Sequence, residues 1–400
     1  MSQAVTAAGS HPNIAIILNA ITPYRVALHL RVAREIPEVR LWTLYTHGTP
    51  DQPWTTAPAP EINPVEFGEH DDVEQQSAPK WALREFFKAG RIIRWLVANR
   101  VRAVFLSGYS DLGRLRIFRW CSKNDVPIFL LADSNIYCDR ARGLKKTLKS
   151  IIVKQVVRWC AGVMPFGSAG ARYYHRYGAV SARIAYFPQE PDYGAIETMD
   201  SDEIRHTTSE FHLSPQRRRF VYCGRFQTVK RPDLAIRAFV RATDQFPDWD
   251  LVLIGDGPLM ATCLSLVPAG LKHRVLFTGF LGDQRQITGI YRLCDVLVVP
   301  SDSDAWGLVV NEATCAGLAI IASEVVGAVP ELVHPGVNGL VVPKDDEAEL
   351  ASAMAGISQD SVRLEAMKQA SRRILHDWRV AGDPIKGMRA ALSLARVLET

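Results

Sequence analysis

Several features that would place a chain in a membrane, secreted or zinc-binding class are absent from this sequence of 400 residues. No apolar run approaches the ~20 residues that a membrane-spanning helix needs, and the first 24 residues contain no lysine or arginine, as a secretory signal peptide would. The seven cysteines are odd in number and widely spaced, with no Cys-x-x-Cys pair to bind zinc or exchange disulfides. These absences predict a chain that folds in a reducing cytoplasm, with its cysteines as buried free thiols.

A dinucleotide fingerprint is also missing from the first predicted strand–helix turn. There the run NIAIIL (Asn13–Leu18) leads through NAITPYR into a helix that reaches Arg34, without any G-x-G-x-x-G pattern. A dinucleotide site is therefore not expected at this turn. No repeat of 20 to 50 residues and no low-complexity tract is present. What remains is a globular composition, 48% hydrophobic, ample for the cores of two domains.

Charge is unevenly distributed along the chain, although the net charge is only +5. Residues 84–158 contain 17 lysines and arginines against 5 acids, whereas residues 61–74 contain six acids and no lysine or arginine. The basic stretch predicts an anionic partner, namely lipid headgroups, a diphosphate-linked acceptor or nucleic acid. Nucleic acid ranks last because no aromatic platforms lie between the basic residues and no recognition motif is present. Solvated helix faces that bind no partner stay an equal alternative.

One part of the basic stretch, residues 140–158, is predicted to form an amphipathic helix. Its apolar positions fall near one face, while Lys145, Lys146 and Lys149 lie elsewhere. Such a helix can lie on an anionic membrane surface, and it can equally pack on a sheet as in any α/β protein. Peripheral contact with the inner face of the plasma membrane, through residues 140–158, is therefore a hypothesis.

Strands and helices alternate through both halves of the chain, which predicts an α/β fold of two Rossmann-like doubly wound domains. A Pro-rich, acidic stretch at residues 188–203 separates the halves and is typical of a domain boundary. The predicted domains are residues 1–190 and 191–379. The predicted strands are residues 13–18, 39–45, 103–107, 127–132, 163–166 and 183–187 in the first half, and 219–223, 251–254, 275–279 and 296–300 in the second.

The second half is organised around a predicted strand, loop, helix and strand between Asp295 and Ser323, with the helix over 306–316. Two acids, Asp304 and Glu312, lie eight residues apart in this unit. Eight helical residues rise ~12 Å, too far for the acid and base of one bond cleavage, which need ~5 to 9.5 Å. The acids suit the two ends of one extended ligand, with a diphosphate at the helix N-terminus between them. A nucleotide diphosphate sugar has this layout, with Glu312 at the ribose and Asp304 at the sugar.

The ten residues from Asp304, DAWGLVVNEA, resemble the E-x7-E motif of the retaining glycosyltransferases of family four, which have the GT-B fold of two domains facing a central cleft. Asp304 stands where that motif has its first glutamate, and aspartate is one carbon shorter. The sequence Gly224-Arg225-x4-Lys230 resembles the phosphate clamp of the family, in which a glycine makes a tight turn and two cations bind the diphosphate. The resemblance, which includes bacterial members, is close from about residue 220 to 345 and architectural before residue 190.

This resemblance implies which residues bind the donor. Arg225, Lys230 and the helix N-terminus would stabilise the departing diphosphate in place of a metal ion. The turns at Gly255 and Gly279 would border the nucleotide base. The implied donor-binding residues are Gly224, Arg225, Lys230, Gly255, Gly279, Asp304, Trp306, Gly307, Leu308, Val309 and Glu312.

On the acceptor side, the candidates are Arg25, Asp133 and Asn135. Arg25 follows the first strand, and the other two follow the strand at 127–132, where open α/β sheets bind their ligands. Asp133 stands near the place where many relatives have a histidine, and it is either a base that orients the acceptor or a helix N-cap. The catalytic candidates are Arg225, Lys230, Asp304 and Asp133.

The activity that the resemblance implies is transfer of a sugar from a UDP- or GDP-type donor to a hydroxyl of a glycan, a lipid-linked sugar or a small molecule, with retention and without a metal. It also implies that a terminal helix, residues 380–400, completes the first domain. The alternatives are a nucleotide-sugar-binding or scaffold protein with weakened catalysis, and a GT-B nucleotide-sugar epimerase. Asp302 and Asp304 also form an Asp-x-Asp pattern, which is a metal-binding signature in the other major glycosyltransferase fold.

Overall fold

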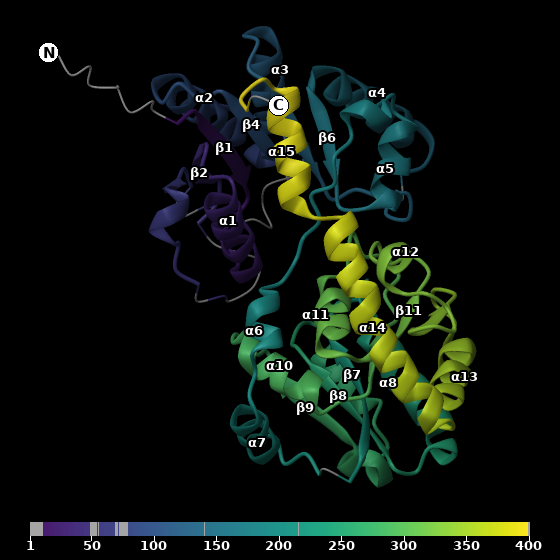
Figure 1. The fold of residues 1–400 in the computed structure, drawn as a ribbon. Helices are drawn as coiled ribbons and strands as arrows, with labels where there is room; N and C mark the ends of the chain where they lie inside the picture. The colour runs from purple at the N-terminus through teal and green to yellow at the C-terminus, as the bar shows by residue number, and fades with distance from the viewer. Residues whose placement is uncertain are drawn as a thin grey trace, which may run out of the picture.

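A computed structural model of the chain describes residues 11–48, 54, 56–68, 71, 79–139, 141–214 and 216–398. Each half of the chain forms a parallel six-stranded sheet with helices on both faces, and the two domains lie one above the other in Figure 1. The structure therefore confirms the predicted α/β class and the two Rossmann-like domains of a GT-B fold.

The first sheet has the strand order β3-β2-β1-β4-β5-β6. Its apolar strands are buried on both faces, as a parallel sheet between two helical layers requires. Helices α2, α3 and α4 cover one face, and α1 and α15 cover the other. The strands are β1 (Asn13–Leu18), β2 (Arg40–Tyr45), β3 (Pro64–Glu66), β4 (Ala103–Ser107), β5 (Ile128–Ala132) and β6 (Gly162–Pro165), and the helices are α1 (Pro23–Glu35), α2 (Ala82–Ala98), α3 (Leu112–Lys123), α4 (Gly143–Trp159) and α5 (Ser168–His175).

The second sheet has the strand order β12-β11-β10-β7-β8-β9. Helices α8, α9 and α13 pack on one face, and α10, α11 and α12 pack on the other. The strands are β7 (Arg218–Cys223), β8 (Trp249–Ile254), β9 (Val275–Gly279), β10 (Val296–Val299), β11 (Ala319–Ser323) and β12 (Gly339–Val342). The helices are α6 (Tyr193–Glu197), α7 (Ser201–Glu210), α8 (Pro232–Ala242), α9 (Met260–Ser265), α10 (Gln284–Arg292), α11 (Leu308–Ala316), α12 (Val329–Leu332), α13 (Glu347–Ser358) and α14 (Ser361–Ala381).

The chain passes between the domains twice, and the Arg31 side chain forms ion pairs with both connecting segments. Arg31 on α1 donates to Glu190 in the first crossing at 2.6 Å and to Asp383, at the start of α15 (Pro384–Leu394), at 2.8 Å. Helix α15 then packs on the first domain, where Arg389 pairs with Glu38 at 2.8 Å. In Figure 1, α14 runs along the second domain and α15 along the first.

Some predicted elements differ from the structure. The predicted strand at 183–187 is wrong, because this stretch makes a short 3-10 turn (Ser181–Arg183) and a single bridge from Ile184 to Val163. The predicted helix at 306–316 begins two residues later, at Leu308. Arg140 of the helix predicted over 140–158, and the last two residues of the helix predicted over 380–400, lie outside the described residues.

The cysteines differ from the prediction in part. No disulfide joins any two of the seven, but Cys138 and Cys223 are half-buried, whereas the other five are buried. No helix among the described residues is both long and apolar enough to cross a bilayer.

Candidate functional site

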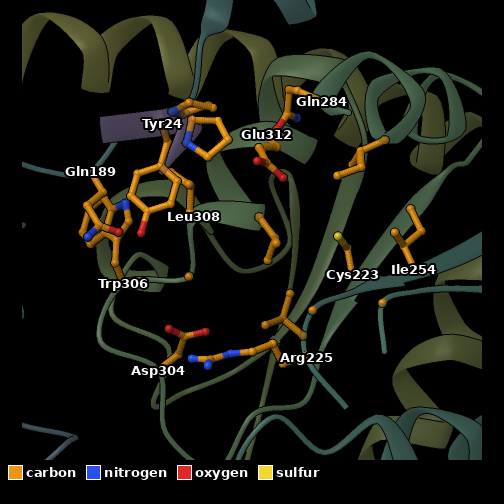
Figure 2. A pocket seen from close by; sticks show the side chains of 18 of the residues that line it. Tyr24, Gln189, Cys223, Arg225, Ile254, Gln284, Asp304, Trp306, Leu308 and Glu312 are labelled. Carbon is orange, nitrogen blue, oxygen red and sulfur yellow. The ribbon is translucent and has the colours of Figure 1, made fainter. Parts of the chain in front are cut away.

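A cleft of about 480 Å³ lies between the two domains. The second domain supplies most of its lining, from the loops that follow β7, β8 and β10 and from the first turns of α10 and α11. The first domain contributes fewer side chains, from the start of α1 and the end of β5. The cleft therefore lies at the carboxyl ends of the strands, where open α/β sheets bind ligands. Lining residues shown in Figure 2 include Tyr24, Gln189, Cys223, Arg225, Ile254, Gln284, Asp304, Trp306, Leu308 and Glu312.

The loop after β7 brings two cations to one end of the cleft. Its first residue, Gly224, lies against Gly255, where an added Cβ would be only 2.0 Å from the Gly224 carbonyl oxygen. The close approach of these two turns therefore requires a glycine at 255. Both Arg225 and Lys230 line the cleft, and the Arg225 side chain points towards Asp304 in Figure 2.

Lys230 and Asp304 form an ion pair, with the lysine Nζ 2.5 Å from the carboxylate Oδ2. The loops that carry them are also joined by their backbones, because the Asp302 N–H donates to the Val229 carbonyl at 2.9 Å. The predicted clamp cation and the predicted sugar-binding acid thus face each other across the same end of the cleft. An anionic ligand that binds Lys230 has to compete with the Asp304 carboxylate or share the cation with it.

The two acids of the Asp-x-Asp pattern contact different cations. The Asp302 carboxylate accepts from Arg231 at 3.1 Å, outside the cleft lining, whereas Asp304 pairs with Lys230. Within the described part of the chain, no group of three or more His, Cys, Asp or Glu side chains is arranged to hold a metal ion. The two acids are therefore not arranged as a common metal site in this structure.

The first turn of α11 lies between Asp304 and Glu312. Gly307 is the N-cap, with φ of 88°, and a Cβ there would come within 2.7 Å of the Val326 side chain. This left-handed residue turns the chain from the Asp304 loop into the helix. Leu308 and Val309 line the cleft, so the positive end of the helix dipole is directed at the space between the two acids.

Glu312 lies at the opposite end of the site from the two cations. Its side chain is buried but lines the cleft, and its Oε2 accepts a hydrogen bond from the Tyr291 hydroxyl at 3.1 Å. Burial raises the pKa of Glu312 to about 7. The Gln284 carboxamide lies beside Glu312 in Figure 2 and offsets part of this rise, yet its buried Nε2 has no partner with normal hydrogen-bond geometry. A ribose hydroxyl would supply partners for both side chains.

On the first domain's side, Asp133 follows β5 and lines the cleft. The carboxyl group keeps solvent access through the cleft, but the surrounding protein raises its pKa by desolvation, against the opposing charges of Arg25 and Arg114. The N-cap alternative is wrong, because the next helix, α4, begins only at Gly143 and has Arg142 as its N-cap. Asp133 thus remains the polar candidate for contact with an acceptor.

Asn135 is not available to an acceptor, contrary to the prediction. The side chain is buried, and its Nδ2 donates to the Ala305 carbonyl of the second domain at 2.8 Å. Its Oδ1 accepts from the backbone N–H groups of Tyr137 and Cys138. Asn135 therefore ties the first domain to the loop that carries Asp304.

Two further predicted residues lie outside the cleft lining. The Arg25 guanidinium donates to the Ala20 carbonyl at 3.1 Å, and its neighbour Tyr24 lines the cleft instead. Gly279 lies behind the lining, where its carbonyl accepts from the Gly255 N–H at 2.9 Å.

Trp306 does line the cleft but is buried, with its ring near those of Phe166 and Trp378. The structure brings the remaining predicted residues together at the cleft: Gly224, Arg225, Lys230, Gly255, Asp304, Gly307, Leu308, Val309, Glu312 and Asp133.

Several side chains of the site were not predicted, and four of them carry polar groups next to predicted residues or reach the cleft from the first domain and its crossing segment. Tyr24 and Gln189 reach the cleft from the first domain and from the crossing segment, while Gln284 and Tyr291 surround Glu312 from α10. For Tyr24 a signal existed, since it lies in the same turn as Arg25. For Gln284 and Tyr291 no signal existed, because α10 reads as an ordinary amphipathic helix.

Comparison with known proteins agrees with this geometry. Residues 217–360 match the model of the family described as glycosyl transferases group 1. The chain is 33% identical over 203 residues to the lipopolysaccharide core biosynthesis mannosyltransferase LpsB of Rhizobium meliloti, covering 47% of this chain and 56% of that one. It is 31% identical over 202 residues to the D-inositol 3-phosphate glycosyltransferase of Nocardia farcinica, covering 48% of this chain and 43% of that one. The chain thus spans about half the length of these curated relatives.

The fold extends the likeness to the whole chain. The crystal structure of the Anabaena protein HepE in complex with UDP and glucose superposes with a TM-score of 0.69 at 15% identity, over 96% of this chain and 99% of that one. At this identity the likeness shows the fold alone. Residues 217–360, which lie within the second domain, therefore match the glycosyl transferases group 1 family, in a chain with the GT-B fold.

Proposed function

We propose that this protein is a retaining glycosyltransferase that moves a sugar from a nucleotide diphosphate donor to an acceptor hydroxyl without a metal ion. One observation carries the proposal: Arg225 and Lys230 lie at one end of a single cleft, Glu312 lies at the other, and the N-terminus of α11 lies between them. A diphosphate needs the cations and the helix N-terminus, and a ribose needs hydrogen-bonding groups such as those of Glu312.

The relatives and the neighbouring structure support a sugar nucleotide as the donor. LpsB and the Nocardia farcinica protein are named as a mannosyltransferase and a glycosyltransferase, and HepE was crystallised with UDP and glucose. The cleft of the present chain offers the same kind of ligand a cationic end and a ribose end. The donor in the proposal is therefore a UDP- or GDP-type sugar.

In the proposed reaction the bond from the anomeric carbon to the diphosphate oxygen breaks, a bond to the acceptor oxygen forms, and the proton of the acceptor hydroxyl passes to the Asp133 carboxylate. The nucleoside diphosphate leaves with the electron pair, so negative charge grows on its phosphate oxygen. Arg225, Lys230 and the first turn of α11 are placed to stabilise this charge. The ion pair between Asp302 and Arg231 supports a reaction without a metal. The family resemblance supports retention of the anomeric configuration.

The first domain would bind the acceptor. Asp133 would accept a hydrogen bond from the attacking hydroxyl and orient it towards the sugar, because its carboxyl group lines the cleft on the first domain's side. The proposed acceptor is a glycan, a lipid-linked sugar or a small molecule. The lack of a disulfide among the seven cysteines supports a cytoplasmic site of action.

Thermal-shift titrations with UDP, GDP and ADP test the donor half of the proposal. A bound nucleoside diphosphate raises the melting temperature in proportion to the logarithm of its concentration over its dissociation constant. One of the three should protect the protein, and its sugar derivatives should then be turned over in the presence of excess EDTA. If no nucleoside diphosphate protects at millimolar concentration, the proposal fails. Protection without hydrolysis or transfer would favour a nucleotide-sugar-binding protein with weakened catalysis.

A further inference from the structure

Exposed apolar side chains gather on three helices of the first domain. Of these, Phe87 on α2 is 68% exposed and Leu144 on α4 is 90% exposed. All of them lie in the amino-terminal halves of α2, α3 and α4, except Val97 near the end of α2. The three helices cover the same face of the sheet, and α3 contacts both α2 and α4. We call their exposed side chains the apolar face: Leu83, Phe86, Phe87, Leu112, Leu144, Leu148 and Ile151.

Basic side chains surround the apolar face. Helices α2, α3 and α4 contain thirteen lysines and arginines and a single acid, Glu85. That acid is buried and pairs with Lys88, which is also buried, at 2.7 Å. These three helices therefore present positive charge and apolar groups to solvent, and no exposed negative charge. This combination is typical of surfaces that bind anionic lipid headgroups and insert side chains among them.

A groove on α2 and α3 shows how the two kinds of group are combined. It has a volume of about 660 Å³ and is lined by Phe86, Phe87, Arg91, Arg94 and Arg116 among others. The Arg116 guanidinium lies over the Phe86 ring, 4.1 Å from its centroid, and donates to the Phe86 carbonyl at 2.7 Å. Arginine side chains beside exposed aromatic rings can bind a phosphate while the rings enter the lipid interface.

The apolar face lies towards the edge of the sheet that also carries the acceptor candidate. Helices that connect parallel strands begin at the carboxyl ends of those strands. Consistent with this, Arg114 near the start of α3 contacts the Ser107 carbonyl at the end of β4, and Lys149 of α4 pairs with Asp139 in the segment after β5 at 3.0 Å. Asp133 lies at the start of that same segment.

We propose that the amino-terminal halves of α2, α3 and α4 form a docking face for an anionic lipid bilayer. The exposed apolar side chains enter the interface, and the surrounding arginines and lysines bind lipid phosphates. The sequence predicted such contact only through residues 140–158, whereas the structure extends the face to α2 and α3. If the proposed function holds, this face delivers an acceptor carried by the membrane, such as a lipid-linked sugar, to the side of the cleft that holds Asp133.

Co-flotation with vesicles tests the docking face directly. The full chain is mixed with vesicles of phosphatidylcholine containing phosphatidylglycerol, and with vesicles of phosphatidylcholine alone. We expect binding to the first and little to the second, with binding weakened by salt because the attraction is partly between charges. The double variant Phe87→Glu with Leu144→Glu should reduce binding by at least ~10-fold, because acids oppose both insertion and the lipid charge. The charge variant Arg91→Glu with Lys145→Glu should reduce it as well.

The matched control is Val362→Glu on α14, which replaces a side chain that is 80% exposed in the second domain. It should float with vesicles as the wild type does. Melting temperature and nucleoside diphosphate protection of each variant separate lost docking from lost folding or a failed donor site.

Three outcomes overturn the docking face. The first is that the wild type does not float with anionic vesicles. The second is that the Phe87→Glu/Leu144→Glu variant floats as well as the control, and the third is that sedimentation shows the wild type dimerising through this face. A soluble polyanion that binds the wild type and the apolar double variant equally, without vesicle binding, also counts against the bilayer.

Discussion

The two domains share one architecture, but their charged groups serve different surfaces. In the second domain the predicted donor-binding side chains line the wall of the cleft, with Arg225 and Lys230 on the loop after β7 and Glu312 on α11. In the first domain few polar groups reach the cleft, and most of the positive charge lies on the outer helices. Under the two proposals above, the same fold serves a small charged ligand in one domain and a larger partner in the other.

The largest expected effect is on the cationic end of the cleft. Arg225→Ala or Lys230→Ala should lower the rate of sugar transfer by ~10² to 10³, because each removes a donor aimed at the leaving phosphate. Steady-state kinetics with a saturating acceptor measure this loss. The control is Arg241→Ala, whose exposed side chain lies 3.5 Å from Glu347 and outside the cleft. Equal transfer rates for Arg225→Ala and Arg241→Ala would show that the cationic end of the cleft in the second domain does not take part in the reaction.

A second prediction compares the first domain with the second through Asp133. Asp133→Asn keeps the shape of the side chain but weakens its ability to accept the hydroxyl proton, so transfer should fall by ~10². Protection by the nucleoside diphosphate should be unchanged, since the donor lies against the other domain. Asp125→Asn, at an exposed turn of the same domain, is the control. If the nucleoside diphosphate no longer protects Asp133→Asn against thermal unfolding, the first domain also takes part in donor binding, contrary to the proposed separation of roles.

Glu312 gives a prediction about stability and pH. Its pKa is raised by burial to about 7, so the native state holds the proton more tightly than the unfolded chain does. The carboxyl group therefore contributes stability at low pH, and this contribution is lost as the pH rises through about 7, at a total cost of about 3 kcal/mol. Glu312→Gln removes the titration. The melting temperature of the wild type should fall relative to Glu312→Gln between pH 5 and pH 8 by several degrees.

That comparison is made within one pair of proteins, so it does not depend on the other titrating groups of the chain. A difference in melting temperature that stays constant across this pH range would show that the Glu312 carboxyl is not held protonated by its surroundings.

The smallest effect concerns the contact between the domains. Asn135→Ala removes a buried amide that donates to the Ala305 carbonyl, and should lower the free energy of unfolding by about 1 to 3 kcal/mol. Denaturant unfolding measures the change. Asn124→Ala, an exposed residue at the end of α3, should change stability by much less. If both variants unfold alike, Asn135 does not hold the domains together.

Most residues predicted for the second domain's site lie together at the cleft because they are close along the chain. Glycines at 224, 255 and 307 fix tight turns, and the acids follow directly from the spacing along one loop and helix. The structure also shows where local patterns fail. The left-handed Gly307 delays the helix that periodicity alone would start at Trp306, and the strand predicted at 183–187 has a single bridge in place of a ladder.

The first domain was harder to predict because its contacts are made across the fold. Asn135 follows a strand as a ligand-binding residue would, but its amide is taken up by a loop that lies 170 residues further along the chain. Arg25 and Tyr24 are neighbours in one turn, and only the packing of α1 decides which of them faces the cleft. No spacing along the chain carries that information.

The most direct test of the proposed site is a binding cycle that separates the diphosphate from the nucleoside. The nucleoside diphosphate that protects the wild type, and its parent nucleoside, are titrated by calorimetry into the wild type, Arg225→Ala and Glu312→Ala. The proposed site predicts that Arg225→Ala weakens binding of the nucleoside diphosphate by at least ~10-fold and leaves binding of the nucleoside unchanged. Glu312→Ala should weaken the binding of both ligands. If Arg225→Ala weakens the two ligands equally, or neither of them, the cations do not bind the diphosphate and the central claim is contradicted.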